Sequence, residues 1–567
     1  MTVAVASNLN GLLQRTALFT AEQIQALLLK NAQTHLGVTA TVVSEGLASE
    51  AVFLAALGKA LGLQFRELDA TTIETAVLEK LPTKAVFQHN VLPVAIENGV
   101  LLVAASDPFS PGLTDSLRLA SGMRVRLVLA ASADIARTAK KRYGVGAETV
   151  EQLMQDNRIE VEDDSVKFKT ELNEDDQEAS IVKFVNQIIW EAYQERATDI
   201  HFEPMENELR IRYRIDGVLH ATPLPPQLTR FQAAILSRIK VMANMDIAEK
   251  RLPQDGRIGL RIRGEDIDIR VSTMPTVYGE SVSLRLLLRG KEHIGLEQLG
   301  FNPRDKGLIE KMIRRPNGII LVTGPTGSGK STSLYAFLHE INSVEDRIIT
   351  VEDPIEYEMA GINQIHVRQE IGLTFATALR HILRQDPDII MVGEIRDFET
   401  AEMAIRASLT GHLVLSTLHT NDSAGAVTRL IDMGVEPFLV ASSLEGIIAQ
   451  RLVRRLCPAC RKSVPMDEAL AAELHVSPEA RLQANIYESN GCEKCRNTGF
   501  RGRFGIFEVL AVNDTIEPLI VARASSSTLK QKALSQGMKT LREDGWAKVL
   551  EGTTTVEEVL RVTEESE

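Results

Sequence analysis

The sequence predicts an α/β protein whose C-terminal half is built on a parallel sheet. Residues 324–331 read G-P-T-G-S-G-K-S and match the phosphate-loop pattern G-x-x-x-x-G-K-[ST] at every fixed position. An apolar run at 318–322 enters this loop, and a helix-like run at 331–338 leaves it. Three more apolar runs alternate with segments of helical length, at 348–351, 389–392 and 413–417. This alternation is typical of a parallel sheet covered by helices, with ligands bound at the carboxyl ends of the strands.

Length and composition bound the rest of the chain. The 567 residues are too many for one core, and we expect about three or four domains. The net charge of −13 excludes a protein that binds nucleic acid through its overall electrostatics. No apolar run reaches about 18 residues, and the N-terminus lacks the basic start and apolar core of a signal peptide. We therefore expect a cytoplasmic protein whose association with a membrane goes through partners.

Residues 1–145 indicate a small α/β module. Thr20 and Gln23 have the spacing of a capping box ahead of an apolar helix, and a second helix is expected over 49–63. Strand-like runs follow at 91–95 and 100–104. The module has no catalytic pattern, so a docking domain is the favoured interpretation.

Residues 146–178 differ sharply from this module. Between 151 and 178 the chain has 11 acidic and 3 basic residues and few apolar ones. Such a composition is typical of a flexible, solvated linker, with an acidic interaction segment as the alternative.

Residues 179–290 predict a second, strand-rich unit with many basic residues. Charged and apolar residues alternate over 209–215, 257–263 and 266–271, which indicates strands with one face in a core and one face charged. Most of these arginines are expected to solvate an exposed sheet face. A few could instead be presented to phosphates of a neighbouring active site.

The third unit, residues 291–567, contains the phosphate loop. We expect the loop and the start of its helix to bind ATP or GTP through Gly324, Thr326, Gly327, Ser328, Gly329, Lys330, Ser331 and Thr332. Lys330 would reach the β- and γ-phosphates, and the Ser331 hydroxyl would ligate Mg²⁺.

Acidic and imidazole side chains follow the other predicted strands. Glu394 follows the strand at 389–392, as the acid of a Walker B arrangement does, and Glu352 and Glu356 follow the strand at 348–351. His419 follows the strand at 413–417, at the same predicted sheet edge. Glu394 is favoured as the general base, but Glu352 stays open as the alternative.

The four cysteines form two C-x-x-C pairs, Cys457 with Cys460 and Cys492 with Cys495. Two such pairs can supply four thiolates to one structural zinc ion, which leaves no open position for a substrate. A disulfide or free thiols are the alternatives, and a disulfide is the poorer one in a cytosolic protein.

Beyond about residue 179 the chain resembles the ATPases of the type II secretion and type IV pilus superfamily, most of all the assembly ATPases of type II secretion. The matching blocks include 197–204 (A-T-D-I-H-F-E-P), 214–219 (R-I-D-G-V-L) and 246–257 (D-I-A-E-K-R-L-P-Q-D-G-R). They continue through the acidic cluster at 352–356, the segment 384–394 and the histidine-containing segment 410–421.

The resemblance implies a RecA-like ATPase domain after a PAS-like α/β domain and a small docking domain. It also implies a zinc-binding subdomain at 456–500 and a helical C-terminal extension at 505–567. ATP with Mg²⁺ and Zn²⁺ are the implied cofactors.

The resemblance further implies a hexameric motor that hydrolyses ATP to assemble a pseudopilus, with pilus extension as the alternative. A nucleotide-gated scaffold without turnover is disfavoured. Arg270 and Arg285 match the arginines that such proteins insert into the nucleotide site of a neighbouring subunit. The implied partners are the cytoplasmic part of an inner-membrane secretion protein, bound by the first domain, and an inner-membrane platform protein. Some relatives bind cyclic di-GMP through Arg-Leu-Gly motifs, but here the corresponding positions read Asn8-Leu9-Asn10 and His35-Leu36-Gly37, so we expect no such ligand.

Overall fold

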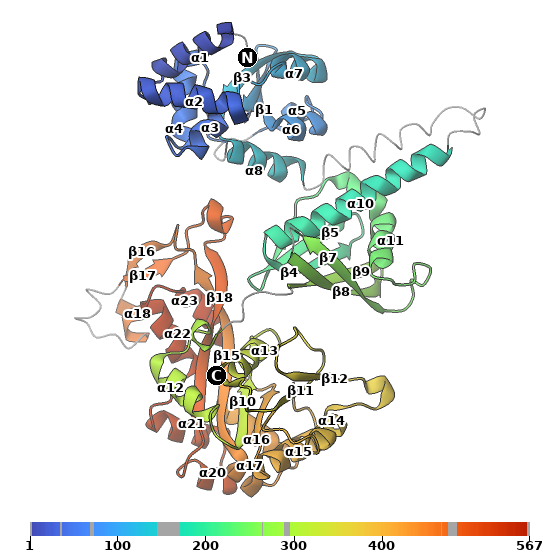
Figure 1. Ribbon diagram of the computed structural model, residues 1–567, viewed down its shortest axis with the longest axis vertical. Coiled ribbons are helices and arrows are strands. Elements are labelled where there is room, and N and C mark those ends of the chain that lie inside the picture. The colour runs from blue at the N-terminus through green and yellow to red at the C-terminus, as the bar shows by residue number, and fades with distance from the viewer. Residues whose placement is uncertain are drawn as a thin grey trace. The chain divides into compact units, whose positions relative to one another are not determined.

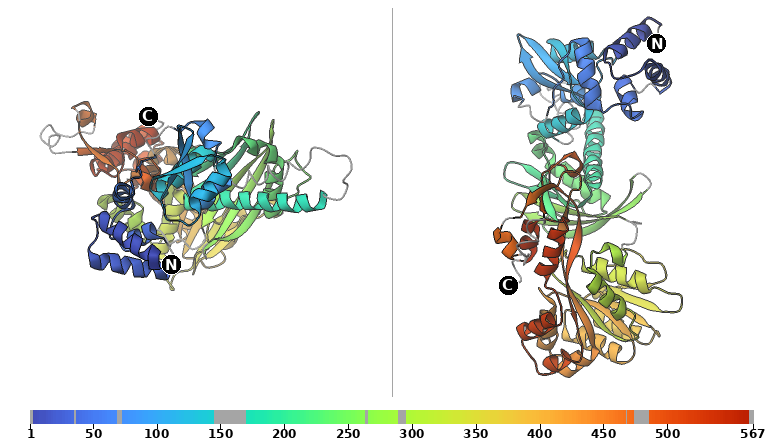
Figure 2. Two further views of the ribbon diagram at one scale, coloured as in Figure 1. Left: turned by 90° about the horizontal axis from the view of Figure 1, so that it is seen from above. Right: turned by 90° about the vertical axis from the view of Figure 1, so that its left-hand side faces the viewer.

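The computed structural model describes residues 3–34, 37–68, 73–144, 170–262, 265–288, 295–466, 468–473 and 485–563. The chain divides into two compact units, Met1–Leu288 and Arg289–Glu567. Figures 1 and 2 show that both units are mixed helix and sheet, which confirms the α/β class. The predicted boundary between 290 and 291 lies outside the described residues.

The first part of unit one is a helical bundle followed by a small sheet. Its strands have the order β1-β2-β3, and β3 is parallel to β2. The elements are α1 (Val3–Arg15), α2 (Ala21–Thr34), α3 (Val38–Ser44), α4 (Glu50–Leu61), α5 (Thr75–Leu78), α6 (Thr83–His89), β1 (Val91–Glu97), β2 (Val100–Ala105), α7 (Leu113–Ser121), β3 (Arg124–Leu129) and α8 (Ser132–Tyr143). The predicted capping box is confirmed, because the backbone N–H of Gln23 donates to Thr20 Oγ1 (3.3 Å) and that of Thr20 donates to Gln23 Oε1 (2.9 Å). His35 and Leu36 lie outside the described residues.

The second part of unit one is a six-stranded sheet in the order β6-β5-β4-β9-β8-β7. Its elements are α10 (Thr170–Gln194), β4 (Ala197–Pro204), β5 (Leu209–Ile215), β6 (Val218–Ala221), α11 (Gln232–Met242), β7 (Gln254–Ile262), β8 (Glu265–Thr276) and β9 (Gly279–Leu288). Apolar residues of α10 and α11 pack on one face of this sheet, and the strands place their charged residues on the other.

The acidic linker predicted over 146–178 extends too far along the chain. Helix α10 already begins at Thr170, so the last nine residues of the predicted linker are helical. The acidic residues near this start suit a helix, because glutamate has a high helix propensity and negative charge is favourable at a helix N-terminus. The remainder of the predicted linker, 146–169, lies outside the described residues.

Unit two is built on a seven-stranded sheet in the order β12-β11-β13-β14-β10-β15-β18, in which only the edge strand β18 runs antiparallel to its neighbour. The strands are β10 (Gly318–Thr323), β11 (Ile348–Glu352), β12 (Asn363–His366), β13 (Ile389–Val392), β14 (Leu413–Leu418), β15 (Leu444–Leu456) and β18 (Phe500–Ala511). The helices before and between them are α12 (Pro303–Met312), α13 (Lys330–Ile341), α14 (Phe375–Ile382), α15 (Phe398–Leu409), α16 (Ser423–Asp432) and α17 (Pro437–Ser443). All four strands predicted from the sequence around the phosphate loop are present.

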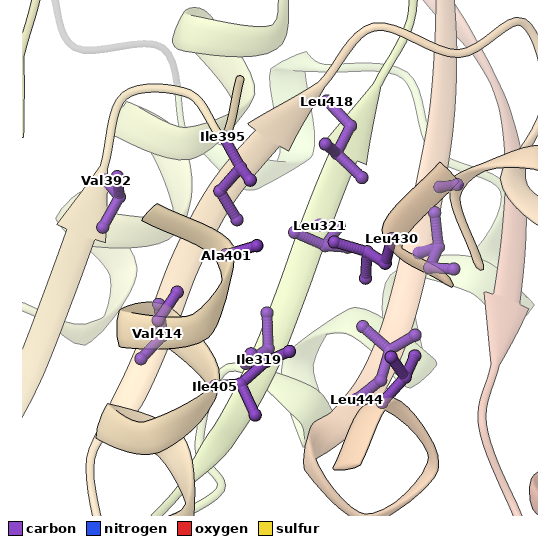
Figure 3. Packing of buried hydrophobic residues seen from close by; sticks show 14 of the residues in the cluster. Ile319, Leu321, Val392, Ile395, Ala401, Ile405, Val414, Leu418, Leu430 and Leu444 are labelled. Atoms are coloured by element: carbon purple, nitrogen blue, oxygen red, sulfur yellow. The ribbon is translucent and has the colours of Figure 1, made fainter. Parts of the chain in front are cut away.

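Helices cover this sheet on both faces, as the parallel topology requires. Figure 3 shows one face, where Ile319 and Leu321 of β10 pack against Ile405 of α15 and Leu430 of α16. A second cluster on the other face includes Phe337 of α13. The two clusters hold the strand ends in fixed positions.

The helical extension predicted over 505–567 is wrong at its start. Residues 505–511 belong to β18, which pairs with β15 and is rich in residues that favour strands, such as Phe507 and Val509. Helices follow only from α20, and they are α20 (Glu517–Val521), α21 (Ser526–Ser535), α22 (Leu541–Leu550) and α23 (Val556–Thr563). Between β15 and β18 lie β16 (Lys462–Pro465), α18 (Glu468–Glu473) and β17 (Asn485–Glu488).

None of the helices in the described part of the chain has both the length and the apolar character needed to span a membrane.

Candidate active site

Four adjacent parallel strands bring the predicted site residues of unit two to one edge of the sheet. Strands β11, β13, β14 and β10 are consecutive and parallel in the sheet, so their carboxyl ends lie at the same edge. Glu352 ends β11, Glu394 follows β13, and His419 follows β14. The phosphate loop follows β10 at the same edge, so the sheet topology gathers all four groups.

The phosphate loop connects the end of β10 to the first turn of α13. The backbone φ angles of Gly324, Gly327 and Gly329 are 147°, 81° and 90°, values that residues other than glycine rarely adopt. A Cβ added to Gly324 would lie 2.5 Å from the carbonyl oxygen of Gln450. The glycines therefore permit both the curvature of the loop and its close approach to strand β15.

The side chains of the loop suit a polyphosphate. Buried Ser328 Oγ has no hydrogen-bond partner among the described residues. Ser331 and Thr332 lie in the first turn of α13, with Ser331 exposed, and Thr326 is exposed on the loop. A buried hydroxyl without a partner beside backbone N–H groups at a helix N-terminus offers donors to phosphate oxygens.

Lys330 lies across the loop. Its ammonium donates to the carbonyl oxygens of Gly324 (2.8 Å) and Pro325 (3.1 Å). The pKa of Lys330 is lowered to about 8, mainly by burial; the Glu394 carboxylate raises this pKa and the Arg451 guanidinium lowers it. The cation is therefore held where phosphate charge would replace its carbonyl partners.

Glu352 is 4% exposed and holds three hydrogen-bond donors. Thr350 Oγ1 (2.6 Å) and Gln364 Nε2 (3.1 Å) donate to Oε1, and the Tyr335 hydroxyl donates to Oε2. The Tyr335 hydroxyl also accepts from the backbone N–H of Glu356 (3.2 Å). Tyr335 thus connects α13 to Glu352 at the end of β11 and to the backbone of Glu356 after it.

Glu394 faces two cationic or polar partners. Its Oε1 lies 2.6 Å from the Arg396 guanidinium, and its Oε2 lies 3.3 Å from His419 Nε2. The predicted proximity of Glu394 and His419 is therefore present. The Glu394 carboxylate can accept a proton from water, and His419 can orient this carboxylate.

Several contributing residues escaped the sequence interpretation. Tyr335 and Gln364 hold Glu352, Arg396 contacts Glu394, and Gln450 and Arg451 flank the phosphate loop. The one available signal was in β15, where Gln450 and Arg451 interrupt a run of apolar residues.

Arg270 and Arg285 lie in unit one, within a row of charged residues that crosses five strands. Asp199 on β4 is paired with Arg214 on β5 and with Arg285 on β9. Arg285 is paired with Arg270 on β8, which is in turn paired with Arg257 on β7. Residues directly opposite one another in a sheet share a face, so four arginines and one aspartate form a single line on the charged face.

Asp199 fixes the central arginine of this row. The Asp199 side chain is 8% exposed, whereas that of Arg285 is 60% exposed. Arg285 Nε donates to Asp199 Oδ1 (2.9 Å), Thr198 Oγ1 donates to Oδ2 (2.8 Å), and Arg214 Nε lies 3.7 Å from Oδ2. The buried carboxylate anchors the base of a guanidinium that reaches into solvent.

The four cysteines converge after β15 and before β18. Their Sγ atoms all lie within 4.8 Å of one another, with separations of 3.8 Å for Cys457–Cys492, 3.6 Å for Cys460–Cys495 and 3.7 Å for Cys492–Cys495. Four thiolates at about 2.3 Å from one zinc ion stand roughly 3.8 Å apart, so the cluster fits that ion.

The environment of Cys495 favours its thiolate. Burial on its own raises the pKa of the Cys495 thiol, but the backbone N–H groups of Cys492 (3.1 Å) and Gly499 (3.3 Å) donate to its sulfur and bring that pKa down to about 7. Such N–H···S contacts are consistent with a metal-binding thiolate.

A phosphate loop after β10, a carboxylate after β13, which only β14 separates from β10, and a parallel sheet define unit two as a P-loop ATPase. The chain matches the type II/IV secretion system protein family over residues 174–561 and the MshEN domain over residues 61–149. The chain therefore belongs to the type II/IV secretion system protein family and is one of its ATPases. This result confirms the resemblance inferred from the sequence.

Individual relatives fit this assignment. The chain is 41% identical to the type IV pilus assembly ATPase PilB of Myxococcus xanthus over 98% of this chain and 99% of that protein. It is 52% identical to the type II secretion system protein E of Pseudomonas aeruginosa over 71% of this chain and 79% of that protein. The ATPase DotB of Yersinia pseudotuberculosis has the same fold, with a TM-score of 0.50 at 19% identity, over 68% of this chain and 93% of that chain.

Proposed function

We propose that this chain hydrolyses ATP to drive assembly of the pseudopilus in type II protein secretion. The observation that carries the proposal is the arrangement of Lys330, Glu394 and His419 at adjacent strand ends. The 52% identity to a type II secretion protein E supports this branch of the family.

The residues have separate roles in this proposal. The loop from Gly324 to Thr332 binds the phosphates, Lys330 neutralises the β- and γ-phosphates, and the Ser331 hydroxyl ligates the Mg²⁺ that accompanies ATP. Glu394 serves as general base for the attacking water, with His419 orienting it. Glu352 is the weaker candidate for the base, because it is 4% exposed and its carboxylate accepts three hydrogen bonds, from Thr350, Gln364 and Tyr335. In this proposal Glu352 and Glu356 instead shape the water and metal environment.

Arg270 and Arg285 complete the site in the proposed hexamer. Guanidinium groups stabilise the charge that develops on the transferred phosphoryl group. The exposure of Arg285 and its anchoring by Asp199 support a role toward a ligand outside its own domain.

The remaining parts have binding and structural roles. Residues 1–145 dock on the cytoplasmic part of an inner-membrane secretion protein, and an inner-membrane platform protein receives the motion. The chain then acts in the cytoplasm at the membrane. Structural zinc binds Cys457, Cys460, Cys492 and Cys495, which the Sγ separations support.

Phosphate release by the full chain tests the central proposal. We expect Lys330→Ala and Glu394→Gln each to lower turnover by at least roughly a hundredfold, because each removes a group required in the transition state. Glu402→Gln, which breaks an ion pair between Glu402 and Arg406 on α15, is the matched control and should keep wild-type turnover. Wild-type-like turnover in Glu394→Gln would exclude Glu394 as the base. The same result in Lys330→Ala would exclude the loop as the catalytic nucleotide site.

Extension of a type IV pilus is a second candidate function. The 41% identity to a pilus assembly ATPase over 98% of the chain favours it. The membrane protein that co-purifies through residues 1–145 discriminates the two candidates, since each system supplies its own docking partner.

A further inference from the structure

Two polar residues lie within the buried strand that runs beside the phosphate loop. Strand β15 is parallel to β10, and its residues Gln450 and Arg451 are 1% and 6% exposed. A guanidinium is rarely buried without a specific role in packing or binding, because removing it from water is costly.

Both residues contact the phosphate loop closely. Gln450 O lies 2.5 Å, and an Arg451 guanidinium nitrogen 3.2 Å, from where a Cβ on Gly324 would be. The Gln450 side-chain oxygen accepts from Ser333 Oγ of α13 (2.7 Å). The start of the loop and the helix that leaves it therefore rest on these two residues.

The other side of the Arg451 guanidinium holds the segment that follows His419. Its second terminal nitrogen donates to the backbone oxygen of Asn421 (3.0 Å) and lies 3.4 Å from Asn421 Oδ1. Arg451 Nη1 donates to the carbonyl oxygen of Gln450 (3.1 Å). The same segment is fastened to the end of β10, because the backbone N–H of Thr420 donates to Thr323 Oγ1 (2.9 Å).

We infer that Arg451 is a positioning residue that holds the segment 419–421 in a fixed place relative to the phosphate loop. A planar guanidinium can bond two groups at once in a set geometry, which a lysine cannot reproduce. Through this bridge Arg451 sets where His419, and with it Glu394, stands relative to bound phosphate. The inference rests on the proposed role of the loop in binding ATP.

The charge of Arg451 has a second effect, on Lys330. The groups that act on the Lys330 ammonium are Glu394, which favours the cation, and Arg451, which disfavours it. Since the pKa of Lys330 is about 8 and phosphate binds the cation, nucleotide affinity is full below that pH and falls as pH rises past it. Removing the positive charge of Arg451 raises the pKa of Lys330 and moves this fall to higher pH.

Two variants separate the geometry from the charge. Arg451→Gln removes both the planar guanidinium and its charge, whereas Arg451→Lys removes the guanidinium and keeps a positive charge. We expect a roughly tenfold loss of kcat in both variants, with KM for ATP changed by less than about twofold. The affinity for a fluorescent ADP analogue is measured from about pH 7 to about pH 9.5. The pH at which this affinity falls should be higher than in the wild type for Arg451→Gln only. Arg455→Gln, on the same strand but exposed over the Phe504 ring, is the matched control and should behave as wild type.

The outcomes separate this inference from the proposed function. Lys330→Ala is assayed alongside, and nucleotide binding that survives it would overturn the role of the loop itself. If Lys330→Ala abolishes binding but both Arg451 variants keep wild-type kcat, only the inference fails. A pH midpoint that rises equally in Arg451→Lys would refute the effect of the Arg451 charge on Lys330, whereas kcat of the two variants decides the positioning role. If thermal melting shows that Arg451→Gln does not fold, kcat of Arg451→Lys decides alone: a tenfold loss supports the bridge and an unchanged value refutes it.

Discussion

At the scale of single residues, Asp199 decides how the exposed Arg285 is presented. The carboxylate is buried at the base of the guanidinium and accepts from its Nε, which leaves the two terminal nitrogens of Arg285 free of this contact. An arginine held in this way loses less conformational freedom when it binds a phosphate than one that moves in solvent. The aspartate is thus a support for a group that acts elsewhere.

Asp199→Asn tests this support. We expect kcat to fall roughly fivefold to tenfold with little change in KM for ATP, because the substitution removes the negative charge that strengthens the hydrogen bond from Arg285. Combined with Arg285→Ala, the substitution should add almost nothing, since the two residues act as one unit. Glu203→Gln, which loosens Arg210 and Arg212 on the same sheet face, is the control. A full additional loss in the double variant would contradict the coupling.

The same scale shows what sequence reasoning could reach. Lys330, Glu394 and His419 were predictable because each belongs to a local pattern in which a strand is followed by a polar residue. Arg451, Gln364 and Asp199 were not, because their partners lie far away in the sequence and meet them only through the sheet register. Contacts of this kind depend on pairing that no local pattern encodes.

At the scale of elements, the four cysteines connect the ends of β15 and β18 with a short sheet of β16 and β17. The backbone N–H of Cys457 donates to the carbonyl oxygen of Gly499 (2.9 Å), so a backbone hydrogen bond connects the first C-x-x-C pair to the segment that follows the second. A metal bound by the four cysteines would hold the end of β15 close to the start of β18.

We expect about one zinc ion per purified chain, with none after replacement of Cys457 and Cys492 by serine. Removal of zinc by a chelator should lower the melting temperature and expose four titratable thiols. Metal analysis combined with thiol counting makes this measurement. Fewer than four free thiols in the denatured, metal-free chain would favour a disulfide instead.

Element boundaries were the weaker part of the sequence interpretation. Net charge suggested a linker as far as residue 178, but local helix propensity extends α10 back to Thr170. The segment from Gly505 was expected to be helical, yet tertiary pairing with β15 makes it a strand. In the first case net charge was weighed above local helix propensity, and in the second the resemblance did not indicate the pairing of this segment with β15.

At the scale of the whole molecule, the phosphate loop and the two candidate arginines belong to different compact units. Unit one carries Arg270 and Arg285, and unit two carries Lys330 and Glu394. The proposed hexamer gives this division a meaning, because each chain would supply arginines to one neighbour and receive them from another.

Mixing two inactive variants of the full chain tests this exchange. A Lys330→Ala chain keeps its arginines but cannot bind ATP productively, whereas an Arg270→Ala, Arg285→Ala chain keeps its loop but lacks the arginines. Equal mixtures should regain up to about a quarter of wild-type phosphate release, because about one interface in four combines an intact loop with intact arginines. No recovery in mixtures shown to co-assemble would indicate that the arginines act within their own chain.

Strand β15 passes beside the phosphate loop at Gln450 and Arg451 and reaches the first cysteine six residues later, at Cys457. An extended chain advances about 3.3 Å per residue, so roughly 20 Å of backbone joins the two places. The residues between them include neither glycine nor proline, and the pairing with β18 is irregular only between Arg454 and Leu456. One β-strand thus connects the nucleotide site with the cysteine cluster. A spectroscopic metal such as cobalt, bound by the cysteines, would therefore report whether nucleotide binding distorts this strand.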